Sequence, residues 1–145
     1  TEVPVKEPDN NESLTPGVFY ICPGGQHLRV TSSGRIQLDG SSGRINGYLP
    51  NIDITMESVA AFAGPLSVGA VLTGMGNDGA AGALAMKAAG GTVFAQDEAT
   101  STIFGMPHEA IKTGAVSKVL GIDEIYGAIE KQVLAIARIA PVGAR

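Results

Sequence analysis

Short apolar runs alternate with alanine-rich and amphipathic stretches along the second half of the chain. Apolar runs bounded by glycine are typical of buried strands, and apolar residues spaced three or four apart are typical of helices that pack on one face. The pattern predicts strands at residues 68–73, 92–96 and 115–120, each followed by a helix, at residues 79–89, 108–113 and 123–139. Strand–helix units in succession give a mainly parallel sheet that is covered by helices on both faces.

The first half of the chain has shorter apolar segments, separated by glycine, proline and serine. Residues 27–31 and 35–38 flank a Ser-Ser-Gly turn and are predicted to form a β-hairpin. Residues 18–22 are an apolar run between two Pro-Gly pairs, which predicts a buried strand, and residues 1–6 alternate as a short strand does.

After Pro50, a helix is predicted at residues 54–63 with Asp53 as its N-cap. The fold class is therefore predicted to be α/β, with three α/β/α layers, a mainly parallel, doubly wound sheet and a β-hairpin. No internal repeat or composition break divides the chain, so we expect one domain over residues 1–145.

The turn that follows the strand at residues 68–73 is rich in glycine and lies where parallel sheets bind ligands, at the carboxyl end of a strand. Gly74, Gly76 and Gly79 match the dinucleotide fingerprint G-x-G-x-x-G, and Asp97 lies near the end of the next strand, as a ribose-binding acid would. Asp78 argues against this interpretation, because its carboxylate would lie beside the pyrophosphate. Like charges about 4 Å apart repel by around 1 kcal/mol in water and more in protein.

Asp78 lies where the turn becomes a helix, so helix N–H groups and the helix dipole are expected to stabilise its charge. One interpretation is a simple N-cap, which contributes about 1 kcal/mol. The other is the acid of a Ser-His-Asp triad, which must stay ionised and rigid to hold a histidine.

Composition removes several other classes of function. The net charge is −4 and the basic residues are scattered, so a nucleic-acid partner is not expected. Cys22 is the single cysteine, which excludes an internal disulfide and is typical of a reducing, cytoplasmic compartment. With only His27 and His108 beside it, no zinc cluster is predicted. No apolar run is long enough for a membrane span, so membrane insertion is not expected.

Several sequence words, in one order, carry a family resemblance. TGMGNDGAAG at 73–82, AQDEA at 95–99 and FGMP at 104–107, with YICPGGQHLRV at 20–30 and PNIDITMESVA at 50–60 upstream, resemble the catalytic domain of the CheB family of chemotaxis protein-glutamate methylesterases. The resemblance implies a cytoplasmic hydrolase of chemotactic signal transduction. Such an enzyme hydrolyses glutamate methyl esters on methyl-accepting chemotaxis receptors during adaptation, and deamidates glutamines there.

The resemblance also implies site residues. The family uses a Ser-His-Asp mechanism, and the acid in its GMGxDG word corresponds to Asp78. Met75, with Gly74 and Gly76, corresponds to the vicinity of the active site, where the Met75 N–H is a candidate donor to the oxyanion. No cofactor is implied.

The sequence lacks two motifs that carry catalytic residues in the family. The family serine lies in a word like GASTGG and the histidine in a word like TQHMP, and neither word occurs in these 145 residues. The receiver domain, through which a chemotaxis kinase phosphorylates the family, is also missing. The segment Tyr48-Leu49-Pro50 also departs from the family, because many members have an arginine before the proline. We therefore expect a partial catalytic domain that keeps the triad acid and is inactive alone.

The missing strands would lie in the middle of the family's sheet, so exposed strand edges are expected to favour a homodimer of this chain. Two other functions remain open at this point: a Rossmann-like dinucleotide-binding module that uses Gly74, Gly76 and Gly79, and a non-catalytic domain that binds receptor tails.

Overall fold

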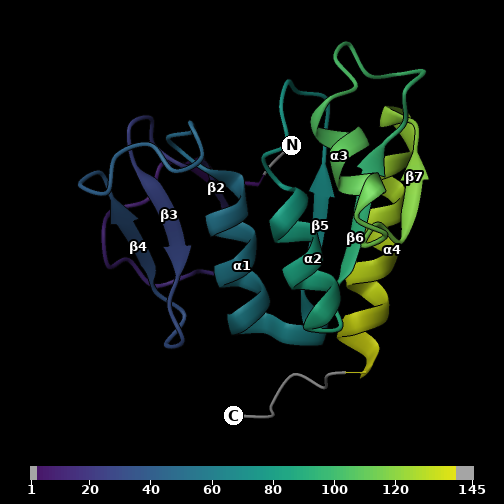
Figure 1. Ribbon diagram of the computed structural model, residues 1–145. Coiled ribbons are helices and arrows are strands. Elements are labelled where there is room, and N and C mark those ends of the chain that lie inside the picture. Colours follow the sequence, from purple (N-terminus) through teal and green to yellow (C-terminus); the bar gives the residue numbers. More distant parts are fainter. Residues whose placement is uncertain (1–2, 140–145) are drawn as a thin grey trace.

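A computed structural model describes residues 3–139 of the chain, which run from a β-hairpin through a helix to a parallel sheet (Figure 1). The elements are β1 (Val5–Lys6), β2 (Phe19–Tyr20), β3 (His27–Val30), β4 (Ile36–Asp39), α1 (Ile52–Ala63), the 3₁₀-helix η1 (Gly64–Leu66), β5 (Val68–Val71), α2 (Ala80–Ala88), β6 (Thr92–Gln96), α3 (Met106–Lys112), β7 (Lys118–Leu120) and α4 (Ile122–Ile139).

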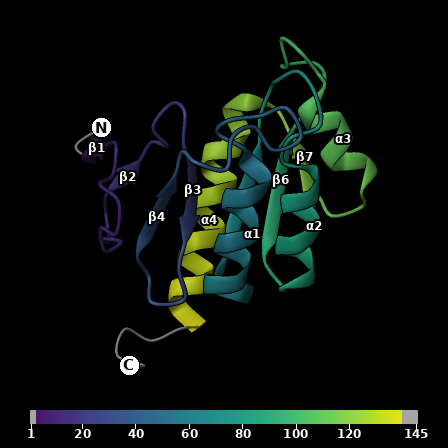
Figure 2. The ribbon, with the colours of Figure 1, turned by 60° about the vertical axis from the view of Figure 1, so that its left-hand side comes forward.

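The predicted strand–helix units form a parallel sheet in the order β5-β6-β7, with Val71 opposite Ala95 and Ala95 opposite Val119. Figures 1 and 2 show α2 and α3 on one face of this sheet and α4 on the other. Helix α1 lies beside α2, in the same layer. The α/β class, the parallel sheet and its helices on both faces are therefore confirmed.

The predicted hairpin is also confirmed. Strands β3 and β4 pair antiparallel, with His27 opposite Asp39 and Val30 opposite Ile36. The hairpin packs on α1 and is fixed there by side-chain hydrogen bonds from the helix. The Thr55 hydroxyl donates to the Leu28 carbonyl at 2.8 Å, and the Ser58 hydroxyl accepts from the Val30 N–H at 2.9 Å.

Small residues allow the helices to approach the sheet closely. The core contains Met56, Ala60, Val71, Ala83, Met86, Val93, Ala110 and Ala115. A Cβ atom at Gly69 of β5 would lie 2.7 Å from the Met86 sulfur, and one at Gly82 of α2 would lie 2.5 Å from the Met56 Cβ. The glycine-rich composition therefore reflects close packing of α2 against both β5 and α1.

Two expected buried faces are largely open. The run at 18–22 was predicted to be a buried strand, but β2 is only two residues long, and Phe19 and Ile21 are 62% and 48% exposed. Helix α4 has the predicted amphipathic spacing, yet Ile125 is its only buried residue within 122–139. In the part of the chain described here, too few elements lie against these faces to bury them.

Helix α4 is the longest helix of the described residues. Neither it nor any other helix within 3–139 is long and apolar enough to cross a membrane.

Candidate active site

The glycine turn after β5 is bonded to the segment that leads into α3. The Gly74 N–H donates to the Ile103 carbonyl at 3.0 Å, and the Gly74 carbonyl accepts from the N–H of Met106 at 2.8 Å. The Thr73 hydroxyl accepts from the Ile103 N–H at 2.9 Å. Two sequence words that are separate along the chain, GMGNDG and FGMP, therefore form one unit at the carboxyl end of β5.

This unit requires glycine at its contact points. A Cβ at Gly105 would lie 2.7 Å from the Gly74 carbonyl oxygen, and one at Gly74 would lie 2.4 Å from the Met106 sulfur. Gly76 and Gly79 have φ angles of +101° and +95°, which side chains disfavour. The turn is thus shaped by backbone packing, which explains its glycines without a phosphate.

Gln96 joins the ends of β5 and β6. It is 2% exposed. Its Oε1 accepts from the Thr73 N–H at 2.8 Å, and its Nε2 donates to the Thr100 carbonyl at 2.8 Å. The neighbouring Asp97 accepts from the hydroxyl and the N–H of Thr100, and these bonds hold the pKa of its carboxyl below the usual value. The residues at this strand end are therefore occupied in fixing the loop.

Asp78 is 3% exposed, and its carboxylate lies at the N-terminus of α1. Oδ1 accepts from the N–H groups of Ile52 and Asp53, both at 2.9 Å, and Oδ2 accepts from the Ile52 N–H at 2.8 Å. The interpretation of Asp78 as the cap of its own helix is wrong, because Gly79 is the N-cap of α2 and Asp78 binds α1 instead. A carboxylate at a helix N-terminus is stabilised in its charged form.

Asp53 has the complementary position and was misassigned from the sequence. The N-cap of α1 is Asn51, whose side chain accepts from the Ile54 N–H at 2.9 Å. The Asp53 carboxylate reaches across to α2 and accepts from the N–H groups of Gly79 at 2.9 Å and Gly82 at 2.7 Å. The sequence does carry a signal for this arrangement. Asn51 and Asp53 are both able to cap α1, and since only one of them is needed there, the other is available for a second helix.

Met75 is the most exposed residue named in this turn, with 77% of its surface accessible. Its N–H makes no hydrogen bond to another group within residues 3–139. The structure therefore places Gly74, Met75, Gly76 and Asp78 together in one turn, as their spacing requires.

Neither histidine makes a hydrogen bond to Asp78. The Nε2 atom of His27 is 2.8 Å from the Gly43 carbonyl in the hairpin region. His108 is exposed on α3, where its Nδ1 lies 3.4 Å from Glu109. The structure shows no serine–histidine pair around Asp78 among residues 3–139.

Two serines of the loop after β4 and the cysteine are not arranged as nucleophiles. The hydroxyls of Ser41 and Ser42 both donate to the carboxylate of Asp39. Cys22 is half-buried outside any strand, contrary to the expected buried strand position, and burial raises the pKa of its thiol. A thiol with a raised pKa is a poor nucleophile at neutral pH.

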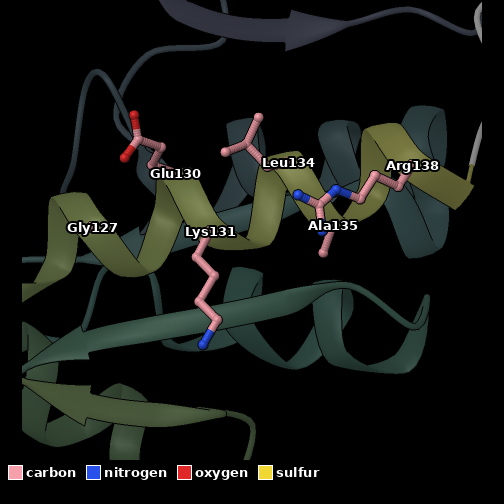
Figure 3. A pocket seen from close by; sticks show the side chains of 6 residues that line it. All are labelled: Gly127, Glu130, Lys131, Leu134, Ala135 and Arg138. Atoms are coloured by element: carbon pink, nitrogen blue, oxygen red, sulfur yellow. The ribbon is translucent and has the colours of Figure 1, made fainter.

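A hollow on the surface of α4 lies away from the glycine turn. Figure 3 shows this hollow of about 360 Å³, lined only by residues of α4: Gly127, Glu130, Lys131, Leu134, Ala135 and Arg138. Lys131 points away from Glu130 and Leu134, so polar groups do not converge there. We therefore place the candidate site at the turn, where the buried carboxylate lies.

The dinucleotide alternative is not supported. A pyrophosphate would require free N–H groups at the start of α2, but those of Gly79 and Gly82 already donate to Asp53. Asp97, the proposed ribose acid, binds Thr100 of its own loop.

Known proteins are similar to this chain in sequence and fold. A family model described as CheB methylesterase matches residues 1–129. A protein-glutamate methylesterase/protein-glutamine glutaminase 2 of Pseudomonas syringae pv. tomato is 43% identical over 133 residues, or 89% of this chain and 37% of that protein. The corresponding protein of Escherichia coli K12 is 44% identical over 128 residues, or 86% of this chain and 36% of that protein.

A solved structure agrees with these relatives. The crystal structure of the CheB methylesterase catalytic domain of Thermotoga maritima matches with a TM-score of 0.79 and 36% identity, over 89% of this chain and 68% of that chain. The chain thus spans little more than a third of the length of the curated relatives and about two thirds of the solved catalytic domain.

Proposed function

Because this chain belongs to the CheB methylesterase family, we propose that it forms part of a protein-glutamate methylesterase and glutaminase, with Asp78 as the acid of a Ser-His-Asp triad. One observation carries the proposal: the Asp78 carboxylate is buried and accepts hydrogen bonds from two backbone N–H groups at the start of α1. The acid of such a triad is a buried carboxylate that orients the histidine and stabilises its charged form.

Asp78 has acceptor capacity left for that histidine. A carboxylate offers roughly four lone-pair positions. Oδ1 accepts two hydrogen bonds, whereas Oδ2 accepts one, from the Ile52 N–H that it shares with Oδ1. We assign the open position on Oδ2 to the imidazole Nδ1–H.

The proposed reaction is acyl transfer. A serine oxygen attacks the carbonyl carbon of the glutamate methyl ester while the histidine takes its proton. The free N–H of Met75 is assigned to the oxyanion, which it would stabilise as a fixed donor. Methanol leaves with the proton from the histidine, and water then releases the glutamate carboxylate. With glutamine as substrate, the leaving group is ammonia.

The serine and the histidine are not among the side chains around Asp78. We propose that the active enzyme needs a further segment that carries both, and that this chain alone is a partial, inactive domain. We also propose, from the family, that the substrates are chemotaxis receptors and that a receiver domain phosphorylated by the chemotaxis kinase regulates the whole protein.

The test uses the complete catalytic domain and methylated receptor, with methanol release as the measurement. Asp78→Asn should lower kcat by up to about 10⁴-fold, the size of triad-acid effects. Asp97→Asn is the matched control, because Asp97 is a carboxylate at the end of the neighbouring strand that binds only its own loop. Its kcat should be unchanged. Equal activity of the two variants would refute the role of Asp78, and ester hydrolysis by the 145-residue chain alone would refute its inactivity.

A further inference from the structure

The first turns of α1 and α2 exchange hydrogen bonds through two aspartates. Asp78, just before α2, accepts from the first N–H groups of α1, and Asp53, in α1, accepts from Gly79 and Gly82 at the start of α2. We propose that Asp53 is a positioning residue for Asp78. This inference rests on the catalytic role proposed above for Asp78.

Asp53 holds Asp78 from two directions. Its backbone N–H donates to Asp78 Oδ1 at 2.9 Å, and its carboxylate accepts at 2.9 Å from the N–H of Gly79, which directly follows Asp78. Loss of the Asp53 side chain would keep both N–H donors to the Asp78 carboxylate, since both belong to the backbone. It would remove the anchor on the peptide that carries Asp78. Asp53 therefore determines where the carboxylate lies, and not how many hydrogen bonds it accepts.

Helix α2 has no local substitute for this anchor. Its N-cap is Gly79, which has no side chain and a φ angle of +95°. The N–H of Gly82 is one of the first-turn donors that a helix cannot satisfy internally. With Asp53 absent, the first turn of α2 would lose its only side-chain acceptor among the described residues, and Asp78 would gain freedom to move.

The exchange also explains how two carboxylates can be accommodated at adjoining helix starts. Their like charges repel, but each carboxylate faces the N–H groups and the positive dipole end of a helix. Asp78 faces the start of α1, and Asp53 faces the start of α2. Figure 1 shows both helices beginning at the end of the molecule where β5 terminates. The two helix starts thus form one rigid support for the acid.

The test measures kcat and KM of the complete catalytic domain with methylated receptor. Asp53→Ala should lower kcat on the order of 10²-fold with KM unchanged, since a displacement of about 1 Å costs that much in rate. Asp53→Asn should lose less, roughly tenfold, because Gly79 and Gly82 both donate to the single oxygen Oδ1, and an amide oxygen can accept the same two bonds without the charge that strengthens them. Glu57→Gln, one turn further along α1 and exposed, is the control and should keep full activity.

Two further measurements separate positioning from general damage. Hydrogen exchange of the Gly79 and Gly82 amides should accelerate in both Asp53 variants and not in Glu57→Gln. Adding Asp53→Asn to Asp78→Asn should cause no further loss of kcat, because Asp53 acts through Asp78.

Unchanged kcat in Asp53→Asn, or an equal loss in the Asp78→Asn background, would overturn the inference, and the Asn variant carries this test if the Ala variant does not fold. Full activity of Asp78→Asn would instead refute the proposed function, while the exchange rates would still report whether Asp53 anchors α2.

Discussion

Two helical glycines with opposite surroundings test the close contact between α1 and α2. Gly82 lies inside α2 and faces α1, where an added Cβ would lie 2.5 Å from the Met56 Cβ and 3.1 Å from its sulfur. Gly127 lies inside α4, exposed, where an added Cβ would meet nothing within 4 Å. Alanine replaces glycine in a helix at both positions, but the added methyl group meets α1 at Gly82 and solvent at Gly127.

The two substitutions are expected to change the free energy of unfolding in opposite directions. Glycine to alanine favours the folded state by about 1 kcal/mol at Gly127, in the interior of α4, and by less at Gly82, in the first turn of α2. At Gly82 this gain is offset by overpacking, which costs typically 1–3 kcal/mol. The Met56 Cβ is attached to the backbone and cannot rotate away, so the helices must separate. Separation also lengthens the hydrogen bonds between Asp53 and α2, each with a net contribution of about 1 kcal/mol. We expect Gly82→Ala to destabilise by about 1–3 kcal/mol and Gly127→Ala to stabilise by about 1 kcal/mol.

Urea unfolding followed by circular dichroism at 222 nm measures both variants against the parent chain. Each kcal/mol should also shift the melting temperature by about 2–4 °C for a chain of this size. If Gly82→Ala proves as stable as Gly127→Ala, the close approach of the two helices is refuted.

Three further predictions follow from other contacts. Asn51→Ala removes the N-cap of α1 and should lower the free energy of unfolding by about 0.5–2 kcal/mol in urea titrations, whereas Asn51→Asp should keep most of it; an unchanged midpoint for alanine would contradict the cap. Burial raises the pKa of Cys22, so less thiolate is present at neutral pH; iodoacetamide should react more slowly than with free cysteine and faster as the pH rises, and rapid labelling at pH 7 would contradict this. The edge of β5 opposite β6 pairs with no strand within residues 3–139, so sedimentation should show a dimer that forms with rising concentration; a monomer at all concentrations would count against edge pairing.

The parts of the fold that depend on local pattern could be predicted from the sequence. Strand β6 has the predicted bounds, and the hairpin and the helices lie within a few residues of their predicted positions, because apolar spacing and glycine stops act over neighbouring residues. The start of α1 was misplaced because Asn51 and Asp53 are both able to cap a helix, and only packing decides which one does.

Contacts between distant segments could not be predicted in this way. The role of Asp53 depends on N–H groups 26 and 29 positions away in the sequence, and that of Gln96 on Thr73, 23 positions away. The prediction that residues 18–22 are buried was wrong for a related reason. Phe19 is apolar enough for a core, but burial requires an element to cover it, and that is a property of the assembled fold.

The exchange of caps between α1 and α2 has a consequence for how the molecule opens. The start of α1 depends on Asp78, which lies just before α2, and the start of α2 depends on Asp53 of α1, so neither helix is completely capped until both have formed and docked. Capping usually stabilises a helix locally and independently of its neighbours, but here it contributes to cooperativity. Local fluctuations that release one helix start should release the other, so the amides of both should exchange with solvent in a single opening event with one free energy. The turn that carries Asp78 would then be ordered or disordered as a unit, with no partly formed state between.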